Sequence, residues 1–350
     1  MRTRSTPAAP PLPSARPGSP RRRIAIFAAA WLAAAAVLAA AGEPPAEADA
    51  APPIEGATAA SRGASDGAKA QRTGPIAQLV AMARAQLPML GFERHAADVA
   101  GQELVWWQKG EGPPVVLIHG VADQAASWLR VAPAIGDGRQ LFVVDLPGHG
   151  ESAPAAGTLT MTAVVAGLTG WLDGHVGAGE RPVTLVGNSM GAWLATIVAH
   201  RHPEWVERAV LINGGPIAPE TGDLDLTPAD RDEARALMAV IRDPSFPATP
   251  DALLDDLVAR VQGGEVERML AAEADLERHL LGDRLGEITA PVTVIWGASD
   301  RYLGDDFRKR LVDGLPNVEL REIPKCGHVP QIECPAALVP HLQATLGPRP

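Results

Sequence analysis

From residue 104 onward, short and nearly continuous hydrophobic runs alternate with longer amphipathic stretches. Runs such as Val-Val-Leu-Ile at 115–118 and Leu-Phe-Val-Val at 141–144 are typical of parallel strands that are buried on both faces. The stretches between the runs suit the helical crossovers that parallel pairing requires. The sequence therefore predicts an α/β fold, a mostly parallel sheet flanked by helices, with an antiparallel pair at its start. We expect strands at 104–108, 115–118, 141–144, 183–186, 209–212, 292–296 and 318–323.

This alternation stops between residues 215 and 288, where helix signals occur without a strand pattern. Thr227-Pro228 and Thr249-Pro250 each pair an N-cap residue with a proline at the first helical position, and 265–281 is strongly helical. The insertion falls between strands 6 and 7 of the expected fold, on the side where the strands end. We therefore expect a helical cap over a site, with a long crossover connection as the alternative.

The N-terminal part of the chain has a different composition. A basic tail, 1–23, ends in three arginines, and an uncharged apolar run follows at 24–41. This run is long for the core of a signal peptide and near the lower limit for a membrane-spanning helix. We expect 24–42 to be a cleaved signal peptide or a membrane anchor, with a buried Ala-rich helix as a third alternative. Either of the first two exports the protein to the periplasm or the extracellular space, and an uncleaved segment would hold it at the membrane.

Residues 43–74 separate this segment from the folded part. They are rich in Ala, Pro, Gly and Ser and lack apolar periodicity, which predicts a disordered linker. The folded domain is then expected over 75–350. It should begin with a short amphipathic helix over 76–87 that ends before Pro88.

A predicted strand, a sharp turn and a helix meet at Gly187-Asn-Ser-Met-Gly191. In this context the serine of a G-x-S-x-G turn adopts a strained backbone conformation that projects its hydroxyl, and the two glycines let the strand and the helix approach each other. We therefore expect Ser189 to be a nucleophile. A buried serine that caps the helix is the alternative.

A neutral serine needs a base within hydrogen-bond reach and a carboxylate that orients this base. Asp300 follows the strand expected at 292–296, and His328 follows the strand expected at 318–323. Both therefore lie at the carboxyl ends of strands, where open α/β sheets form their sites. Taken singly, Asp300 could cap a helix and His328 could be a loop residue, but the order serine, acid, histidine is the one that this elbow requires. We expect Ser189, Asp300 and His328 to form a catalytic triad.

The negative charge that develops on a carbonyl oxygen during attack needs preorganised hydrogen-bond donors. Two backbone N–H groups are candidates for this oxyanion hole. One belongs to Met190, which follows the nucleophile at a helix N-terminus, and the other to Val121, which follows His119-Gly120 after a strand. His119 also competes with His328 for the role of base, but its position before the nucleophile favours support of the loop.

Several segments of the chain resemble the α/β-hydrolase superfamily over about residues 76–346. Within this superfamily, His119-Gly120 followed by Asp123 and Trp128, together with the elbow, is similar to membrane-anchored monoacylglycerol lipases and related bacterial lipases. The resemblance implies hydrolysis of a small-molecule or lipid carboxylic ester through an acyl-enzyme, without a cofactor. The segments are Leu117 to Val121, Asp145-Leu-Pro-Gly-His-Gly150, Gly187 to Gly191, Trp296 to Asp300 and Gly327-His328.

Two other functions compete with this serine esterase or lipase. Carbon–carbon bond hydrolases of the meta-cleavage type share the Gly-Asn-Ser-x-Gly elbow and the triad, but they usually have more glycine after His-Gly than this chain has. Their acidic substrates also need a positioned cation, whereas the many apolar residues of the cap suit an acyl chain. A binding module that kept the fold without catalysis is disfavoured, because no member of the triad is missing.

The charge and the cysteines exclude further classes of partner. A net charge of -10 argues against a nucleic-acid surface, because phosphate binding needs clustered Lys and Arg. Cys326 and Cys334 are the only cysteines, too few for a disulfide framework or a cysteine-rich zinc site, so we expect no metal. We also expect them to stay unbridged. The segment between them must hold His328 against Ser189, and a bridge needs Cα atoms within about 7 Å.

Overall fold

The computed structural model describes residues 74–219 and 226–347. These residues form an eight-stranded sheet with the strand order β1-β2-β4-β3-β5-β6-β7-β8. The basic tail, the 24–42 segment and the linker up to residue 73 lie outside the described residues, so the predictions for them stay predictions. Within the two described stretches, no helix is both long and apolar enough to cross a membrane. The strands are β1 (Glu93–Val99), β2 (Gln102–Lys109), β3 (Pro114–Ile118), β4 (Gln140–Asp145), β5 (Val183–Asn188), β6 (Val206–Ile212), β7 (Val292–Gly297) and β8 (Val318–Ile323).

The sheet is mostly parallel, as the hydrophobic runs predict. β2 pairs antiparallel with both β1 and β4, whereas all pairs from β4 through β3 to β8 are parallel. Every residue of β3, β5 and β7 is buried, which explains their uninterrupted hydrophobicity. β1 was not predicted, because only Val99 of its residues is buried and its sequence therefore carries no hydrophobic run.

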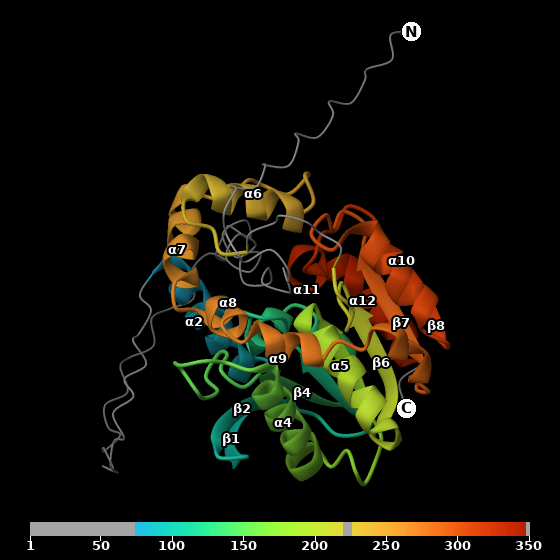
Figure 1. Cartoon of the computed structure of the whole chain (residues 1–350). Helices are drawn as coiled ribbons and strands as arrows, with labels where there is room; N and C mark the ends of the chain where they lie inside the picture. The colour runs from blue at the N-terminus through green and yellow to red at the C-terminus, as the bar shows by residue number, and fades with distance from the viewer. Residues whose placement is uncertain (1–73, 220–225, 348–350) are drawn as a thin grey trace, which may run out of the picture.

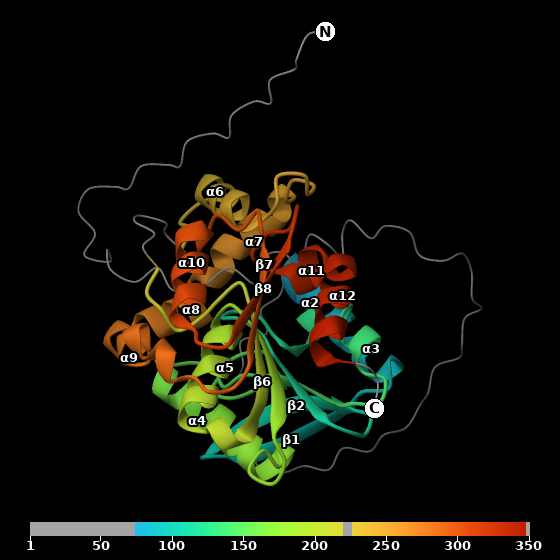
Figure 2. The same cartoon turned by 90° about the vertical axis from the view of Figure 1, so that its right-hand side faces the viewer.

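Helices cover both faces of the sheet (Figures 1 and 2). α4 (Met161–Trp171), α5 (Met190–Arg201) and α10 (Gly304–Gly314) contribute to the hydrophobic core on one face. α3 (Ala132–Ile135) and α12 (Pro335–Leu346) contribute to the core on the other face. Neighbouring residues of β3 divide between the cores, since Val116 belongs to the first and Leu117 to the second. The α/β-hydrolase fold predicted from the sequence is confirmed.

The first described helix ends later than the sequence predicts. α2 (Pro75–Met89) includes Pro88 in its last turn, so the prediction that this helix ends before Pro88 was wrong. The turn is closed after the proline by the N–H of Leu90, which donates to the carbonyl of Gln86.

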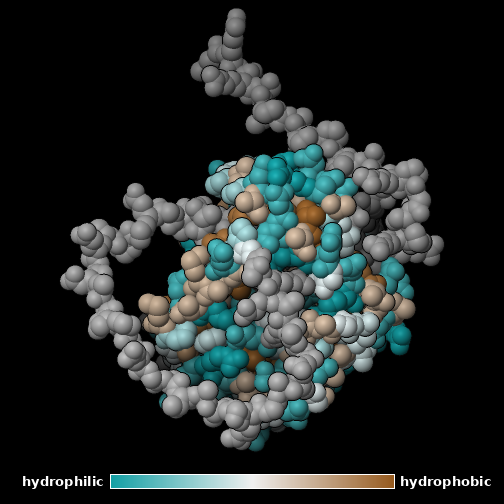
Figure 3. Space-filling view, turned by 90° about the vertical axis from the view of Figure 1, so that its left-hand side faces the viewer, coloured by the Kyte–Doolittle hydropathy of each residue, from teal (hydrophilic) through white to brown (hydrophobic). Residues whose placement is uncertain are grey.

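On the face shown in Figure 3, hydrophobic residues are interspersed among hydrophilic ones. Most of the large apolar side chains of the described residues lie in the two cores.

Among the described residues between β6 and β7, four α-helices form the predicted cap: α6 (Arg231–Ile241), α7 (Asp251–Val261), α8 (Glu265–Leu270) and α9 (Glu273–Arg278). In Figure 1 they extend across the top and the front of the sheet. The expected N-cap at Thr227 was wrong, because the carboxylate of Asp230 caps α6 by accepting from two N–H groups of its first turn. The stretch 265–281 was expected to be one helix, but non-helical backbone at Ala272 divides it into two.

Candidate active site

Ser189 lies at the sharp turn between β5 and α5. Its backbone has φ 56° and ψ -117°, a region that residues other than glycine rarely adopt. The N–H of Ser189 donates a 2.9 Å hydrogen bond to the carbonyl of Ile212 on the neighbouring strand β6, which helps to hold this conformation. The strained turn predicted from the G-x-S-x-G pattern is therefore present.

The glycines at both ends of the elbow are required by close backbone contacts. A Cβ atom at Gly187 would lie 2.1 Å from the carbonyl oxygen of Gly191, and one at Gly191 would lie 2.2 Å from the carbonyl oxygen of Ile118. Both neighbours are backbone atoms of the central sheet or of α5, so they cannot move aside cheaply. A side chain at either position would separate α5 from the strands and displace Ser189.

The structure brings Ser189, His328 and Asp300 together although they are far apart in the sequence. Nε2 of His328 lies 3.0 Å from Oγ of Ser189, and Nδ1 of His328 lies 2.8 Å from Oδ2 of Asp300. All three residues are buried and lie just beyond the carboxyl ends of β5, β8 and β7, respectively. This geometry lets the imidazole take a proton from the hydroxyl while the carboxylate holds its Nδ1–H.

Four donors converge on the carboxylate of Asp300. Oδ1 accepts from the backbone N–H groups of Tyr302 and Leu303, and Oδ2 accepts from Nδ2 of Asn213 as well as from His328. Oδ1 of Asn213 in turn accepts from the N–H of Gly297 at the end of β7. The carboxylate is therefore held by both its own loop and the neighbouring strand, which fixes the direction in which it meets the imidazole.

The main chain of His328 is held from two sides. Its N–H donates to the carbonyl of Ile241 at the end of α6, at 2.7 Å, and its carbonyl accepts from Nδ2 of Asn188, at 3.0 Å. Oδ1 of Asn188 accepts from Nε2 of Gln331, so the residue next to the nucleophile is bonded to the histidine loop at two points. The ring of Tyr302 meets the imidazole edge-on.

The two predicted oxyanion donors lie beside a pocket. Val121 and Met190 line it together with Trp193 of α5, and the cap closes it with side chains from α8 and α9: Val266, Met269, Leu270 and Leu276. Among the described residues, neither the N–H of Val121 nor that of Met190 meets an acceptor. Two unoccupied donors at a pocket next to Ser189 could accept a developing oxyanion.

His119 supports its loop and does not contact Ser189. Its Nδ1 lies 2.6 Å from the carbonyl of Gly120, and its Nε2 accepts from the N–H of Leu146, at 3.0 Å. A nitrogen that accepts from a backbone N–H is unprotonated, so the ring is neutral with its proton on Nδ1. Burial lowers the pKa of His119 well below its ordinary value, in agreement with this neutral form.

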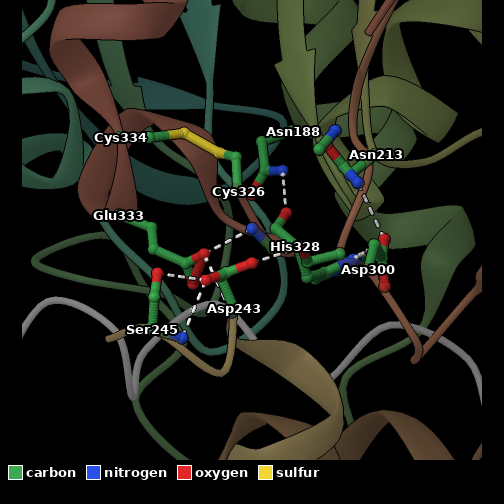
Figure 4. The surroundings of a disulfide bond; sticks show 12 residues. Asn188, Asn213, Asp243, Ser245, Asp300, Cys326, His328, Glu333 and Cys334 are labelled. Atoms are coloured by element: carbon green, nitrogen blue, oxygen red, sulfur yellow. Dashed lines mark hydrogen bonds and ion pairs between the residues drawn. A yellow bond between two sulfur atoms is a disulfide. The ribbon is translucent and has the colours of Figure 1, made fainter. Parts of the chain in front are cut away.

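Cys326 and Cys334 form a disulfide, so the prediction that they stay unbridged was wrong. The chain between them turns through the short helix α11 (Pro330–Glu333), which brings their Cα atoms to 6.0 Å. This distance lies within the range of disulfides, and His328 still reaches Ser189. Figure 4 shows the bridge beside the histidine loop. The bridge therefore closes the loop that carries the histidine instead of distorting it.

Several residues that hold the triad were not predicted from the sequence. They are Asn188, Asn213, Tyr302, Gln331 and Glu333, and all are buried. Only Asn188 carried a signal, since it lies inside the Gly-Asn-Ser-Met-Gly motif. The others act through contacts between segments that are far apart in the sequence, which no local pattern reveals. Within the described stretches, no group of three or more His, Cys, Asp or Glu side chains could hold a metal ion.

The relatives of this chain correct the predicted substrate class. It is 33% identical over 253 residues to a 2-hydroxy-6-oxononadienedioate/2-hydroxy-6-oxononatrienedioate hydrolase of Cupriavidus pinatubonensis, a match that covers 63% of this chain and 81% of the relative. Relatives from Dechloromonas aromatica and Paraburkholderia xenovorans have the same description. The prediction that carboxylic ester hydrolysis is the main activity was therefore wrong, and these findings favour the alternative, a carbon–carbon bond hydrolase. Apolar cap residues suit either substrate class, which is why their number misled the prediction.

The fold comparisons agree with the geometry. The chain is similar to a membrane phospholipase A, with a TM-score of 0.65 and 25% identity over 77% of this chain and 91% of that one. It is also similar to the meta-cleavage product hydrolase CumD of Pseudomonas fluorescens, with a TM-score of 0.61 and 22% identity over 71% and 95%. The model of the alpha/beta hydrolase family matches residues 115–341, a range that includes Ser189, Asp300 and His328. The chain is thus a hydrolase that belongs to the alpha/beta hydrolase family.

Proposed function

We propose that this protein is a carbon–carbon bond hydrolase of the meta-cleavage type, which acts on a 2-hydroxy-6-oxo-dienoate. One observation carries the proposal. A chain related to hydrolases of this substrate has a hydroxyl that is hydrogen-bonded to an imidazole, which is in turn hydrogen-bonded to a carboxylate. The relatives' substrate names describe a dicarboxylate with a ketone at C6 and an enol at C2. The reaction must therefore act on a ketone, and the site must accept carboxylates.

Ser189 is the proposed nucleophile, His328 the base and Asp300 the residue that orients it. Oγ of Ser189 attacks the C6 ketone while His328 takes the hydroxyl proton, and the N–H groups of Val121 and Met190 bind the resulting oxyanion. The bond between C5 and C6 then breaks. This cleavage proceeds from the 2-keto tautomer, in which the proton of the C2 enol has moved to C5, because the electron pair of the C5–C6 bond can then pass through C4=C3 to the C2 carbonyl oxygen. That oxygen takes up the proton that His328 removed from Ser189. Water releases the acyl group from Ser189, so one water yields a carboxylic acid and a 2-hydroxydienoate.

The cap supplies a candidate cation for a substrate carboxylate. Arg242, directly after α6, is only 5% exposed, and its Nη1 donates to Oγ1 of Thr249. Its Nε and Nη2 are buried and meet no acceptor among the described residues. Arg268 of the cap is similarly buried, but its guanidinium already donates to backbone carbonyls of the loop 148–157.

A buried guanidinium with unused N–H groups is costly unless an anion supplies the missing acceptors. Burial lowers the pKa of Arg242, which reflects this cost. Arg242 also lies close to the triad, since the residue before it accepts the backbone hydrogen bond of His328. We therefore assign Arg242 to one substrate carboxylate, which would complete its hydrogen bonds when the substrate binds.

The test is a comparison of kcat/KM for a 2-hydroxy-6-oxo-dienoate and for p-nitrophenyl esters of increasing chain length. We expect the dienoate, followed through the loss of its absorbance, to be the better substrate. Ser189→Ala serves as the control for background reaction. Esters turned over efficiently by enzyme that leaves the dienoate intact would contradict the proposal.

A further inference from the structure

The end of α6 contacts both loops that carry the triad. The carbonyl of Val240 accepts from the N–H of Arg301, at 3.0 Å, and the carbonyl of Ile241 accepts from the N–H of His328. The first bond holds the residue next to Asp300, and the second holds the histidine itself. This part of the cap is therefore joined to the loops beneath it by backbone hydrogen bonds.

Asp243 continues this connection with its side chain. Its Oδ2 accepts from the hydroxyl of Ser299, which precedes Asp300, and its Oδ1 accepts from the N–H and the hydroxyl of Ser245. The carboxylate is buried and has three donors. It fastens the cap segment after α6 to the loop of the catalytic acid.

Glu333 is the central element of this arrangement. Its Oε2 accepts from the N–H of Gly327, the residue before the catalytic histidine, and from the N–H of Asp243, at 3.2 Å. Glu333 is buried at the end of α11, inside the loop that the disulfide closes. Figure 4 shows the Glu333 carboxylate between the His328 loop and Asp243. One carboxylate oxygen therefore links the cap to the histidine loop.

The backbone around Gly327 packs tightly against the cap segment. A Cβ atom at Gly327 would lie 2.2 Å from the carbonyl of Ile241 and 2.9 Å from Cα of Arg242. The histidine loop and the cap segment thus touch through their backbones, with the carboxylate of Glu333 at the same contact. The two hydrogen bonds of Glu333 join these two backbones at this contact.

We propose that Glu333 is a positioning residue that sets the distance between His328 and Ser189 by fastening the histidine loop to residues 241–243 of the cap. It does not touch the substrate and acts through His328. The inference relies on the catalytic roles proposed above for Ser189 and His328, but it does not depend on which substrate the enzyme cleaves.

The charge state of Glu333 should affect this positioning. Burial raises its pKa to about 7, although the N–H groups of Gly327 and Asp243 and the charge of Arg242 act in the opposite direction. Asp243 is the facing acid, and Lys325 acts on Asp243. The ionised carboxylate accepts both N–H groups more strongly than the protonated acid does. Acidification below about pH 7 should therefore loosen the histidine loop.

The test measures the rate at which a fluorophosphonate labels Ser189 in the full chain, because this reaction needs His328 as a base but no particular substrate. The variants are Glu333→Ala, Glu333→Asp and Glu333→Gln. The matched control is Glu287→Gln, which alters an exposed carboxylate that pairs with His200. Rates are expressed per folded protein, from circular dichroism and the melting temperature.

We expect Glu333→Ala and Glu333→Asp to label roughly tenfold or more slowly than wild type, because neither side chain reaches Gly327, and a small displacement of a base is enough for such a loss. Glu333→Gln should stay within about threefold at pH 8, because an amide oxygen still accepts from an N–H. With the dienoate, the loss should fall on kcat and leave KM nearly unchanged.

The pH profile separates positioning from a purely structural role. In wild type, protonation of Glu333 should lower the labelling rate by up to about threefold as pH falls through about 7, and Glu333→Gln should lack this step. The proposal is overturned if the folded Ala and Asp variants label at the wild-type rate, or if Glu333→Gln keeps this step. If the labelling results agree with expectation but the dienoate is not cleaved, only the proposed substrate is wrong.

Discussion

The backbone N–H of His328 donates a 2.7 Å hydrogen bond to the carbonyl of Ile241, so the proposed catalytic histidine is held by the cap as well as by the sheet. Asn188, next to the nucleophile, holds the carbonyl of the same histidine from the opposite side. The cap is therefore part of the framework that aligns the proposed base. Substitutions in it can change turnover without touching the substrate.

Removal of any triad member should abolish most activity. Ser189→Ala, Asp300→Asn and His328→Ala should each lower kcat by about three orders of magnitude or more, because nucleophile, base and orienting acid act as a unit. For the same reason, the double variant Ser189→Ala/His328→Ala should be hardly worse than either single one. Initial rates with the dienoate, on protein with native circular dichroism, check this. Losses that multiply in the double variant would mean that the residues act independently.

Replacement of Arg242 should weaken binding of a substrate carboxylate. The loss of a charge-assisted hydrogen bond of about 2 kcal/mol should raise KM for the dienoate by roughly thirtyfold in Arg242→Met. The control is Arg235→Met, since Arg235 lies on the exposed side of α6 and pairs with Asp232 and Asp251. For a methyl ester of the substrate, which lacks the carboxylate charge, wild type and Arg242→Met should have similar KM values. Equal KM values for Arg242→Met and Arg235→Met would contradict the assignment.

Loss of the disulfide should lower stability. Closing a loop with a sequence separation of 8 residues should contribute about 2–3 kcal/mol through the unfolded state. We expect Cys326→Ser/Cys334→Ser, and wild type in a reductant, to unfold at lower urea concentration, with a free energy of unfolding that is lower by this amount. Free thiols counted in denatured, unreduced protein provide the direct check. Two titratable thiols in that sample would show that the bridge does not form.

Glu333 should make stability depend on pH. Its pKa of about 7 in the folded protein lies above the ordinary value of 4.5. Between these values the folded protein keeps a proton that the unfolded chain has released, so stability falls as pH rises through this window. Relative to Glu333→Gln, wild type should lose up to about 3 kcal/mol in the free energy of unfolding between pH 4.5 and 8. Urea titrations of both proteins measure the difference, and parallel pH curves would show that Glu333 does not titrate there.

The sequence alone determined the features that depend on local pattern. Buried strands must be continuously hydrophobic, which is why β3, β4, β5, β6 and β7 were predicted. The elbow at Ser189 was predicted because a strand, a turn with glycines at both ends and a helix are contiguous in the chain. The order and topology of Asp300 and His328 then placed all three residues at one end of the sheet.

Only the tertiary structure decided what depends on contacts between distant segments. Cys326 and Cys334 can pair because α11 folds the chain back between them, which their spacing does not reveal. The burial of Arg242 and the two N–H groups that meet Glu333 likewise come from the cap's position over the histidine loop. Hydrophobic periodicity reports which face of an element is buried, but not which partner it meets. The choice between an acyl chain and a carboxylate depends on that partner, so the sequence pattern could not make it.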